Sequence, residues 1–146
     1  MVSRFSRWMQ HRANARAITK IQSGNATMMG MELLVLQTVG RRTGRPRQTP
    51  VAWFPDGERR WLVVASGGSD HHPDWYLNLR AHPEAASVML PHGAVVPVTP
   101  HQLDGAERER AWQAIVSAVP RFAKYQAKSG RPYPVVELVG ADAADR

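Results

Sequence analysis

The chain has 146 residues, of which 43% are hydrophobic, and a formal net charge of +7. This length supports a single compact domain over residues 1–146 with a real core, and leaves no room for a second domain. The absence of cysteine excludes disulfides, thiolate metal sites and a cysteine nucleophile, and no apolar run approaches the roughly 20 residues of a membrane-spanning helix. We therefore expect a cytoplasmic protein.

The N-terminal segment, residues 1–29, is predicted to contain a basic amphipathic helix. Apolar side chains recur at three- and four-residue spacings, with five basic residues between them; the apolar residues are Phe5, Trp8, Met9, Ile18 and Ile21. Such a helix suits packing on the domain, which we favour, or peripheral contact with a membrane surface. Residues 1–47 contain nine basic residues and one acid, which gives a charge of +8. Residues 48–146 contain ten basic and eleven acidic residues, which gives −1. This asymmetry predicts an acidic partner.

The core, residues 30–140, is predicted to be rich in strands. Apolar runs separated by turn residues are expected to form about six mainly antiparallel strands, over residues 33–39, 48–54, 61–65, 86–90, 94–98 and 135–139. Helices are expected over 74–80, from Asp104 with Glu107 in a capping-box arrangement, and over 121–128 after Pro120. Because strands and helices do not alternate, the pattern favours an α+β small barrel with peripheral helices, followed by a polar tail over 141–146.

A cationic turn between the first two predicted strands is the most informative segment. Four arginines lie within seven residues, between glycines and a proline that bend the backbone; they are Arg41, Arg42, Arg45 and Arg47. Guanidinium groups held on a tight turn favour phosphate or carboxylate, which they bind with paired hydrogen bonds. A solvated basic loop is the alternative.

Familiar catalytic and nucleotide-binding motifs are absent. The turn does not end in the Gly-Lys-Ser/Thr of a Walker A loop, and no G-x-G-x-x-G follows a strand. The six histidines lack metal-ligand spacing, so no metal site is predicted. Ser66, Asp70 and His72 lie too close along one loop for a hydrolytic triad, and Ser66 lacks a nucleophile elbow.

Three short motifs occur in an order and spacing that resemble the deazaflavin-dependent nitroreductase family. They are TVGRRTGRPR at 38–47, VVASGG at 63–68 and HPDWYLNLRAHP at 72–83, and the match extends over roughly residues 30–140. The resemblance implies a split β-barrel that binds coenzyme F420, an 8-hydroxy-5-deazaflavin with a phosphate and an oligoglutamate tail. Such a tail supplies the acidic partner that the charge asymmetry predicts.

The same resemblance implies three groups of cofactor-binding residues. Arg41, Arg42 and Arg47 match positions that contact the acidic tail, and Thr43 and Thr49 add hydroxyl donors. The channel and the region of the deazaflavin ring are expected to involve Gln48, Pro50, Val51, Ala52, Val64, Ala65 and Ser66. A third stretch comprises Trp75, Tyr76 and Asn78, although packing of a helix on the barrel would explain the two aromatic residues equally well.

The activity that the resemblance implies is hydride transfer from the reduced deazaflavin to an acceptor stacked over its ring. Tyr125 is the candidate for polar contact with the substrate or proton donation, and Ser66 is the second candidate catalytic residue. Val119 and Phe122 stand where some relatives that reduce nitroimidazoles carry tyrosines, and neither can donate a proton. We therefore expect poor reduction of nitroimidazoles, and an apolar pocket lined by Val119, Phe122 and Tyr125 that suits a quinone or another hydrophobic conjugated acceptor.

Alternatives from other classes stay open. A nucleic-acid-binding module would use the same arginines, but Trp53 and Trp61 lie inside apolar runs, and no nucleic-acid partner is expected. A noncatalytic deazaflavin carrier or membrane-associated sensor would bind the cofactor without turnover. A flavin mononucleotide enzyme on the same barrel is the nearest enzymatic rival, although the long cationic turn suits a longer acidic tail, and a homodimer is compatible with all of these.

Overall fold

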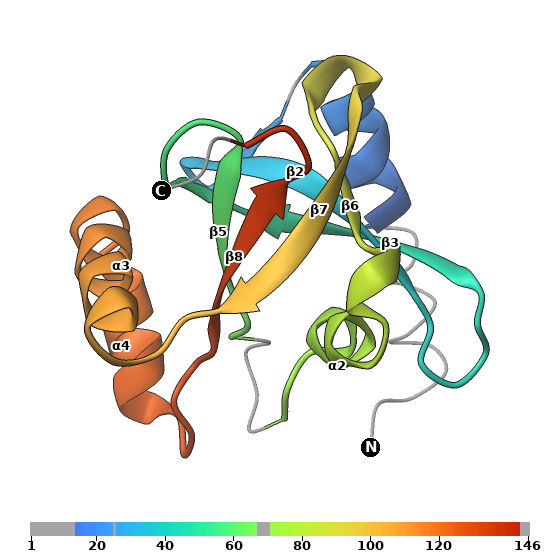
Figure 1. Ribbon diagram of the computed structural model, residues 1–146. Coiled ribbons are helices and arrows are strands. Elements are labelled where there is room, and N and C mark those ends of the chain that lie inside the picture. The colour runs from blue at the N-terminus through green and yellow to red at the C-terminus, as the bar shows by residue number, and fades with distance from the viewer. Residues whose placement is uncertain (1–13, 25, 67–70, 144–146) are drawn as a thin grey trace, which may run out of the picture.

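One curled antiparallel sheet forms the centre of the molecule (Figure 1). The computed structural model describes residues 14–24, 26–66 and 71–143. In these residues the strand order is β1-β2-β6-β7-β8-β5-β4, with β3 paired to β2. The strands are β1 (Thr27–Met28), β2 (Met31–Val39), β3 (Pro46–Ala52), β4 (Phe54–Pro55), β5 (Arg60–Val64), β6 (Ser87–Met89), β7 (Val95–Gln102) and β8 (Val135–Gly140).

Helices lie around this sheet rather than between its strands. Residues 14–22 are helical, and the other α-helices are α2 (Asp74–Ala81), α3 (Gly105–Ala118) and α4 (Arg121–Lys128). Two short 3-10 turns, η1 (Pro83–Ala85) and η2 (Pro91–Gly93), flank β6. Figure 1 shows α3 and α4 together on one side of the molecule and α2 on the other. The predicted α+β class with peripheral helices and antiparallel strands is therefore confirmed.

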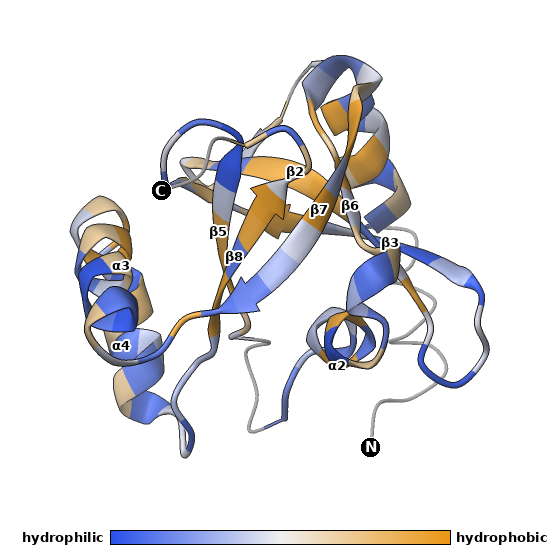
Figure 2. Cartoon of the chain, viewed as in Figure 1, coloured by the Kyte–Doolittle hydropathy of each residue, from blue (hydrophilic) through white to orange (hydrophobic). Residues whose placement is uncertain are grey.

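Strand alternation divides the core into three clusters of apolar side chains. Along β5 and into the residue that follows it, Trp61, Val63 and Ala65 belong to the interior cluster, which also contains side chains of β2 and α2. Leu62 and Val64 point the other way, toward a second cluster under α3 and α4. A third cluster lies between the helix at 14–22 and strands β2 and β6. Figure 2 shows the hydrophobic strands of this core and the hydrophilic turn that joins β2 to β3.

The N-terminal helix is packed on the domain where it is described. Ala17 and Ile21 are buried, and Ile21 contacts side chains of β2 and β6. The helix ends at residue 22, inside the segment 1–29 that was predicted to contain it. Phe5, Trp8 and Met9 lie outside the described residues. No helix in the part of the chain that is described is long and apolar enough to cross a membrane.

Most predicted elements form, with shifted ends. The predicted hairpin at 86–98 is β6 and β7, joined through η2, where His92 has φ of 69°. Asp104 is the N-cap residue of α3, but its side chain makes no capping hydrogen bond, so the predicted capping box is wrong. The second strand begins at Pro46 rather than residue 48, because the hairpin with β2 continues through the arginine run to the pair Val39 and Pro46.

Candidate functional site

The turn between β2 and β3 is held by its own hydrogen bonds. The Gly40 N–H donates to Arg45 O at 2.9 Å, and the Gly44 N–H donates to Gly40 O at 2.8 Å. Thr43 Oγ1 accepts from the Arg45 N–H at 3.2 Å. Gly44 has φ of +68°, and a Cβ on Gly40 would lie 2.7 Å from Thr43 Oγ1, so both positions require glycine. The cationic turn is thus a preformed structure.

Arg41 anchors this turn to α2. Its backbone N–H and its Nη1 both donate to Asn78 Oδ1, at 3.1 and 2.9 Å, and its Nη2 lies 3.3 Å from Asp74 Oδ1. Asn78 is buried, whereas the Asp74 side chain is 87% exposed. The contact with Asn78 therefore carries most of the anchoring, because exposed ion pairs contribute little.

The other three arginines of the turn point their charge into solvent. Arg42, Arg45 and Arg47 are exposed, and none of their side chains makes a hydrogen bond or ion pair with another residue in the described ranges. Three guanidinium groups without a carboxylate partner create a local positive field beside the end of the sheet. This arrangement suits an external anion with several charged oxygens.

The residues predicted to follow the turn into the cofactor channel lie on two faces of β3. Val51 packs in the interior cluster, and Ala52 packs in the cluster under the N-terminal helix. Because side chains alternate along a strand, Arg47 and Thr49 share the interior face with Val51. Gln48 and Pro50 share the opposite face with Ala52. A single ligand on the interior face would contact only the first set through side chains.

A buried hydroxyl group lies on that interior face. Thr38 is 4% exposed, and its Oγ1 has no hydrogen-bond partner in the described part of the chain. Thr38 is directly opposite Arg47 in the β2–β3 pair, and Thr49 is opposite Leu36 on the same face. Buried hydroxyls are normally hydrogen-bonded, so this atom is available to a bound water or ligand. The sequence contained a signal for it, a threonine in an apolar strand directly before the cationic turn.

These donors fit a phosphate and carboxylate tail. Guanidinium groups supply paired N–H donors, and the hydroxyls of Thr38 and Thr49 add short-range donors on the same face. No group of three or more acidic or histidine side chains that could hold a metal ion occurs among the residues described.

The end of β5 and the residues that follow it contain three of the predicted cofactor-binding residues. Ala65 is buried in the interior cluster, while Val64 packs against the cluster under α3 and α4. Ser66 is half-buried, and its carbonyl oxygen accepts from Arg131 Nη2 at 2.9 Å. Arg131 is a residue that sequence reasoning missed, since it lies 65 positions away along the chain.

The aromatic residues of α2 pack in the core. Trp75 and Tyr76 are 9% and 2% exposed and belong to the interior cluster. The Tyr76 hydroxyl donates to Gln102 Oε1 at 2.6 Å, so its polar atom is satisfied inside the protein. Their contact with a cofactor stays a prediction, and packing alone accounts for their burial.

His72 lies against Tyr76 at the start of α2, with ring centroids 4.8 Å apart. Partial burial lowers the pKa of His72 below its ordinary value, and the positive charges of Arg131 and Arg80 lower the pKa further. The imidazole is therefore neutral at physiological pH. Asp70, the third member of the rejected triad, lies outside the described residues.

The residues predicted to face the acceptor lie under α3 and α4. Val119 and Phe122 are 8% and 7% exposed, and they belong to the same cluster as Val64. The Phe122 ring packs edge-on against Phe54 at 6.0 Å and against Tyr125 at 6.1 Å. Tyr125 itself is 44% exposed. Figure 1 shows α3 and α4 on the opposite side of the molecule from the turn between β2 and β3.

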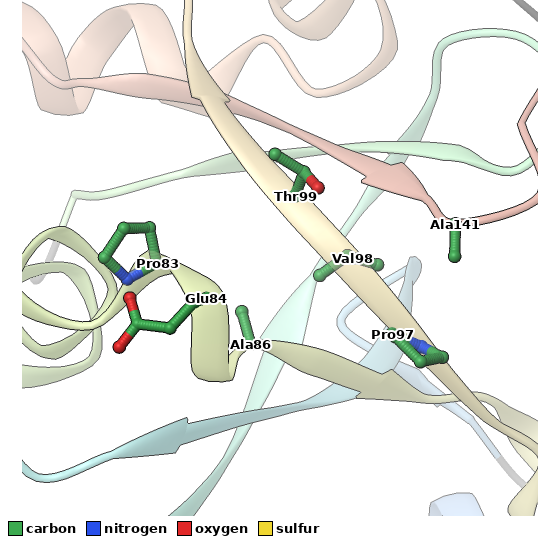
Figure 3. Close-up of a pocket in the computed structure, with 7 residues that line it drawn as sticks. All are labelled: Pro83, Glu84, Ala86, Pro97, Val98, Thr99 and Ala141. Atoms are coloured by element: carbon green, nitrogen blue, oxygen red, sulfur yellow. The ribbon is translucent and has the colours of Figure 1, made fainter.

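Two cavities were found near α2, and neither is lined by the arginine turn. The first, about 450 Å³, lies between η1 and β7 (Figure 3) and is lined by Pro83, Glu84, Ala86, Pro97, Val98, Thr99 and Ala141. The second, about 220 Å³, lies between α2 and strands β7 and β8 and includes Tyr76, Arg80 and Gln102. The exposed side chains of Arg42, Arg45 and Arg47 lie outside both cavities.

Comparison with known proteins gives consistent matches over most of the chain. A family model described as F420H(2)-dependent quinone reductase matches residues 3–139. The chain is 32% identical to the F420H(2)-dependent quinone reductase Rv1261c of Mycobacterium tuberculosis, with 91% of this chain and 96% of that protein covered.

Solved structures show the same fold. An F420-H2-dependent reductase, FDR-A, is 35% identical with a TM-score of 0.63, covering 73% of this chain and 92% of that one. A protein solved as a domain-swapped dimer is 30% identical with a TM-score of 0.66, covering 91% and 98%. A haem-binding protein from Mycobacterium smegmatis, 20% identical with a TM-score of 0.57 over 84% of this chain and 50% of that one, shares the fold alone. The predicted split β-barrel is confirmed.

Proposed function

The chain belongs to the F420H(2)-dependent quinone reductase family, and from this premise we propose how its residues hold the coenzyme and serve the reaction. The predicted family resemblance is confirmed, with quinone reductases as the matched group. The protein is an F420-dependent reductase, and coenzyme F420 is its cofactor. The nucleic-acid-binding and noncatalytic alternatives are not favoured.

The acidic tail of the coenzyme binds at the β2–β3 turn. The observation that carries this assignment is the set of guanidinium groups on a preformed turn, Arg42, Arg45 and Arg47, which have no partner in the described residues. Arg47 and Thr49 continue the site along the interior face of β3, where the unsatisfied hydroxyl of Thr38 also lies. Thr43 keeps its hydroxyl hydrogen available, because its oxygen acts as acceptor within the turn.

An Arg42→Ala, Arg47→Ala variant is expected to bind oxidised coenzyme F420 about tenfold more weakly or worse, because charged hydrogen bonds are lost. Fluorescence titration of the purified protein measures the dissociation constant directly. The exposed Arg110 of α3 provides the matched control, and Arg110→Ala should leave the affinity nearly unchanged. Flavin mononucleotide, which lacks the long acidic tail, should bind more weakly than coenzyme F420 to the wild-type protein. If the Arg42→Ala, Arg47→Ala variant binds the coenzyme as tightly as Arg110→Ala does, the tail does not bind at this turn.

The residues around the end of β5 serve the reacting end of the coenzyme. When bound, reduced F420 supplies the hydride. Val64 contributes apolar surface that excludes water, and Ser66 offers an N–H and a hydroxyl to ring oxygens or nitrogens. Tyr125 lies on α4 and is 44% exposed, and its hydroxyl serves as the proton donor to the acceptor.

The acceptor is a hydrophobic, conjugated molecule such as a quinone, with nitro compounds as the second candidate. Val119 and Phe122 contribute only apolar surface next to Val64, which suits an uncharged ring. A cytoplasmic location is part of this proposal. So is a homodimer, which is supported by the solved relative that forms a domain-swapped dimer.

A Tyr125→Phe variant is expected to lower kcat for quinone reduction about 100-fold, in line with the usual contribution of a general acid. Coenzyme affinity and thermal stability should be unchanged, because the tyrosine is 44% exposed. Steady-state kinetics with reduced coenzyme and a soluble quinone measures this effect. Tyr133→Phe is the matched control, since it removes a buried hydroxyl that donates to Tyr125 O at 3.1 Å and should affect stability more than kcat. If Tyr125→Phe keeps the wild-type kcat, the Tyr125 hydroxyl is not the proton donor and the residue has only a packing role.

A further inference from the structure

One arginine side chain holds both ends of the connection between β5 and α2. Arg131 Nη1 donates to Ala65 O at 3.2 Å, and its Nη2 donates to Ser66 O at 2.9 Å and to His71 O at 2.8 Å. Ala65 and Ser66 directly follow β5, and His71 precedes α2. A planar guanidinium with several donors in fixed directions can bind three carbonyl oxygens together, which a single ammonium group cannot do in the same geometry.

The backbone of Arg131 is itself fixed by side chains from α4 and its end. Gln126 Nε2 and Ser129 Oγ donate to Arg131 O at 2.8 and 3.0 Å, and the Arg131 N–H donates back to Ser129 Oγ at 3.2 Å. Gln126 Oε1 also accepts from the Tyr133 N–H at 2.7 Å. The guanidinium group is therefore presented from a rigid segment, and little entropy is lost when it binds the carbonyls.

The same segment is joined to the acceptor side of the molecule. The Arg131 Cζ lies 5.4 Å from the centre of the Tyr133 ring, and the Tyr133 hydroxyl donates to Tyr125 O at 3.1 Å. Arg131 thus lies between the end of β5 and the part of α4 that carries Tyr125. Movement of Arg131 would change the distance between these two regions.

The hydrogen bonds from Arg131 to the carbonyl oxygens also determine the direction of the Ser66 N–H. In a trans peptide the C=O and N–H groups point in opposite directions, so an Ala65 carbonyl bound to Arg131 turns the Ser66 N–H away from Arg131. The Ser66 hydroxyl makes no hydrogen bond with another residue in the ranges described. The Ala65 N–H, by contrast, donates to Pro134 O at 2.9 Å. Ser66 therefore keeps two donors for an external group.

We propose that Arg131 is a positioning residue of the coenzyme site: it holds Ala65, Ser66 and His71 in place, so that the Ser66 N–H and hydroxyl face the deazaflavin ring on the side from which Tyr125 donates its proton. This inference rests on the proposed function, because it assumes that the ring lies at the end of β5. Arg131 does not touch the coenzyme; it acts through Ser66 and through α4.

An Arg131→Met variant is expected to bind oxidised coenzyme F420 about tenfold more weakly and to lower kcat about tenfold, because a misplaced ring loses both contacts and alignment. Arg131→Lys should recover only part of either value, since an ammonium group has no planar fork. Arg108→Met is the matched control. Arg108 Nη2 donates to Tyr133 O at 2.7 Å and its Cζ lies 5.4 Å from the Trp112 ring, so it supports the same segment without reaching Ala65 or Ser66.

Arg108→Met should lose thermal stability but keep coenzyme affinity and kcat near wild-type values. In the wild-type protein, the backbone amide resonance of Ser66 should shift on addition of coenzyme, a measurement that needs no variant. Wild-type protein that fails to bind the coenzyme would overturn the proposed function. Two results would overturn this inference alone, provided that the wild-type protein binds the coenzyme. One is a Ser66 amide resonance that does not shift, and the other is an Arg131→Met variant with wild-type affinity and kcat.

Discussion

An Arg60→Met variant is expected to lose about 3–5 kcal/mol of unfolding free energy, the usual cost of leaving a buried charge without its partner. Arg60 Nη1 lies 3.3 Å from Glu137 Oε1, and the two side chains are only 12% and 7% exposed. They lie on adjacent, paired strands, β5 and β8. Urea unfolding followed by circular dichroism at neutral pH measures the loss.

The neighbouring Arg59 provides the control. Its Nη2 lies 3.5 Å from Asp142 Oδ2, but the side chains are 34% and 82% exposed, so Arg59→Met should cost less than about 1 kcal/mol. An Arg60→Met, Glu137→Leu double variant should recover much of the stability, since it removes both buried charges. Equal losses in Arg59→Met and Arg60→Met would show that burial does not govern these two pairs.

An Asn78→Leu variant is expected to lose both stability and coenzyme binding. Asn78 Oδ1 accepts from the backbone N–H and from the Nη1 of Arg41, so leucine leaves two donors unsatisfied at a cost of about 1–3 kcal/mol. The turn would no longer be fixed to α2, and affinity for the coenzyme tail should fall about tenfold or more, because preorganisation is lost. Urea unfolding and fluorescence titration measure the two effects.

Asp74→Ala separates the two contacts of Arg41. Asp74 also contacts this arginine, at 3.3 Å, but its side chain is 87% exposed. Its removal should change stability by less than about 1 kcal/mol and should leave coenzyme affinity equal or slightly improved, since a negative charge near the tail is lost. If Asp74→Ala weakens binding as much as Asn78→Leu, the anchoring depends on charge and not on the buried hydrogen bonds.

Asn78 also changes the interpretation of Arg41. The resemblance implied that Arg41, like Arg42, contacts the acidic tail. In the structure its guanidinium is engaged by Asn78 and Asp74, whereas Arg42 and Arg47 have no partner in the residues described. A variant that removes Arg41 would therefore disturb the turn as well as the charge, and Arg42 with Arg47 gives the cleaner test of tail binding.

The sequence was sufficient for features that depend on neighbouring residues. The hairpin of β6 and β7 follows from two apolar runs around Pro91-His92-Gly93, and the break between α3 and α4 follows from Pro120. The cationic turn was equally visible, because glycine and proline determine its bend locally.

Features that depend on distant parts of the chain were not predictable in the same way. The contact of Arg131 with Ser66 joins residues 65 positions apart, and no local pattern distinguishes Arg131 from a solvated arginine. The order of the strands has the same origin, since β5 pairs with β8 although α2, α3, α4, β6 and β7 lie between them along the chain. The sequence alone also did not show which residues of β3 share a face with Thr38. That assignment depends on the register between β2 and β3, in which Thr38 lies opposite Arg47.

The geometry of β3 has a consequence for association between molecules. In the described residues β3 pairs with β2 alone, so its other side is an open sheet edge. The Trp53 N–H donates to Glu32 O, and by alternation the odd-numbered residues direct their N–H groups toward β2. The even-numbered residues face outward, and two of them, Pro46 and Pro50, have no N–H to offer. Only every second outward position along this edge therefore offers an N–H to a strand from another copy. The strand that carries the proposed coenzyme tail site is thus also protected against intermolecular sheet extension.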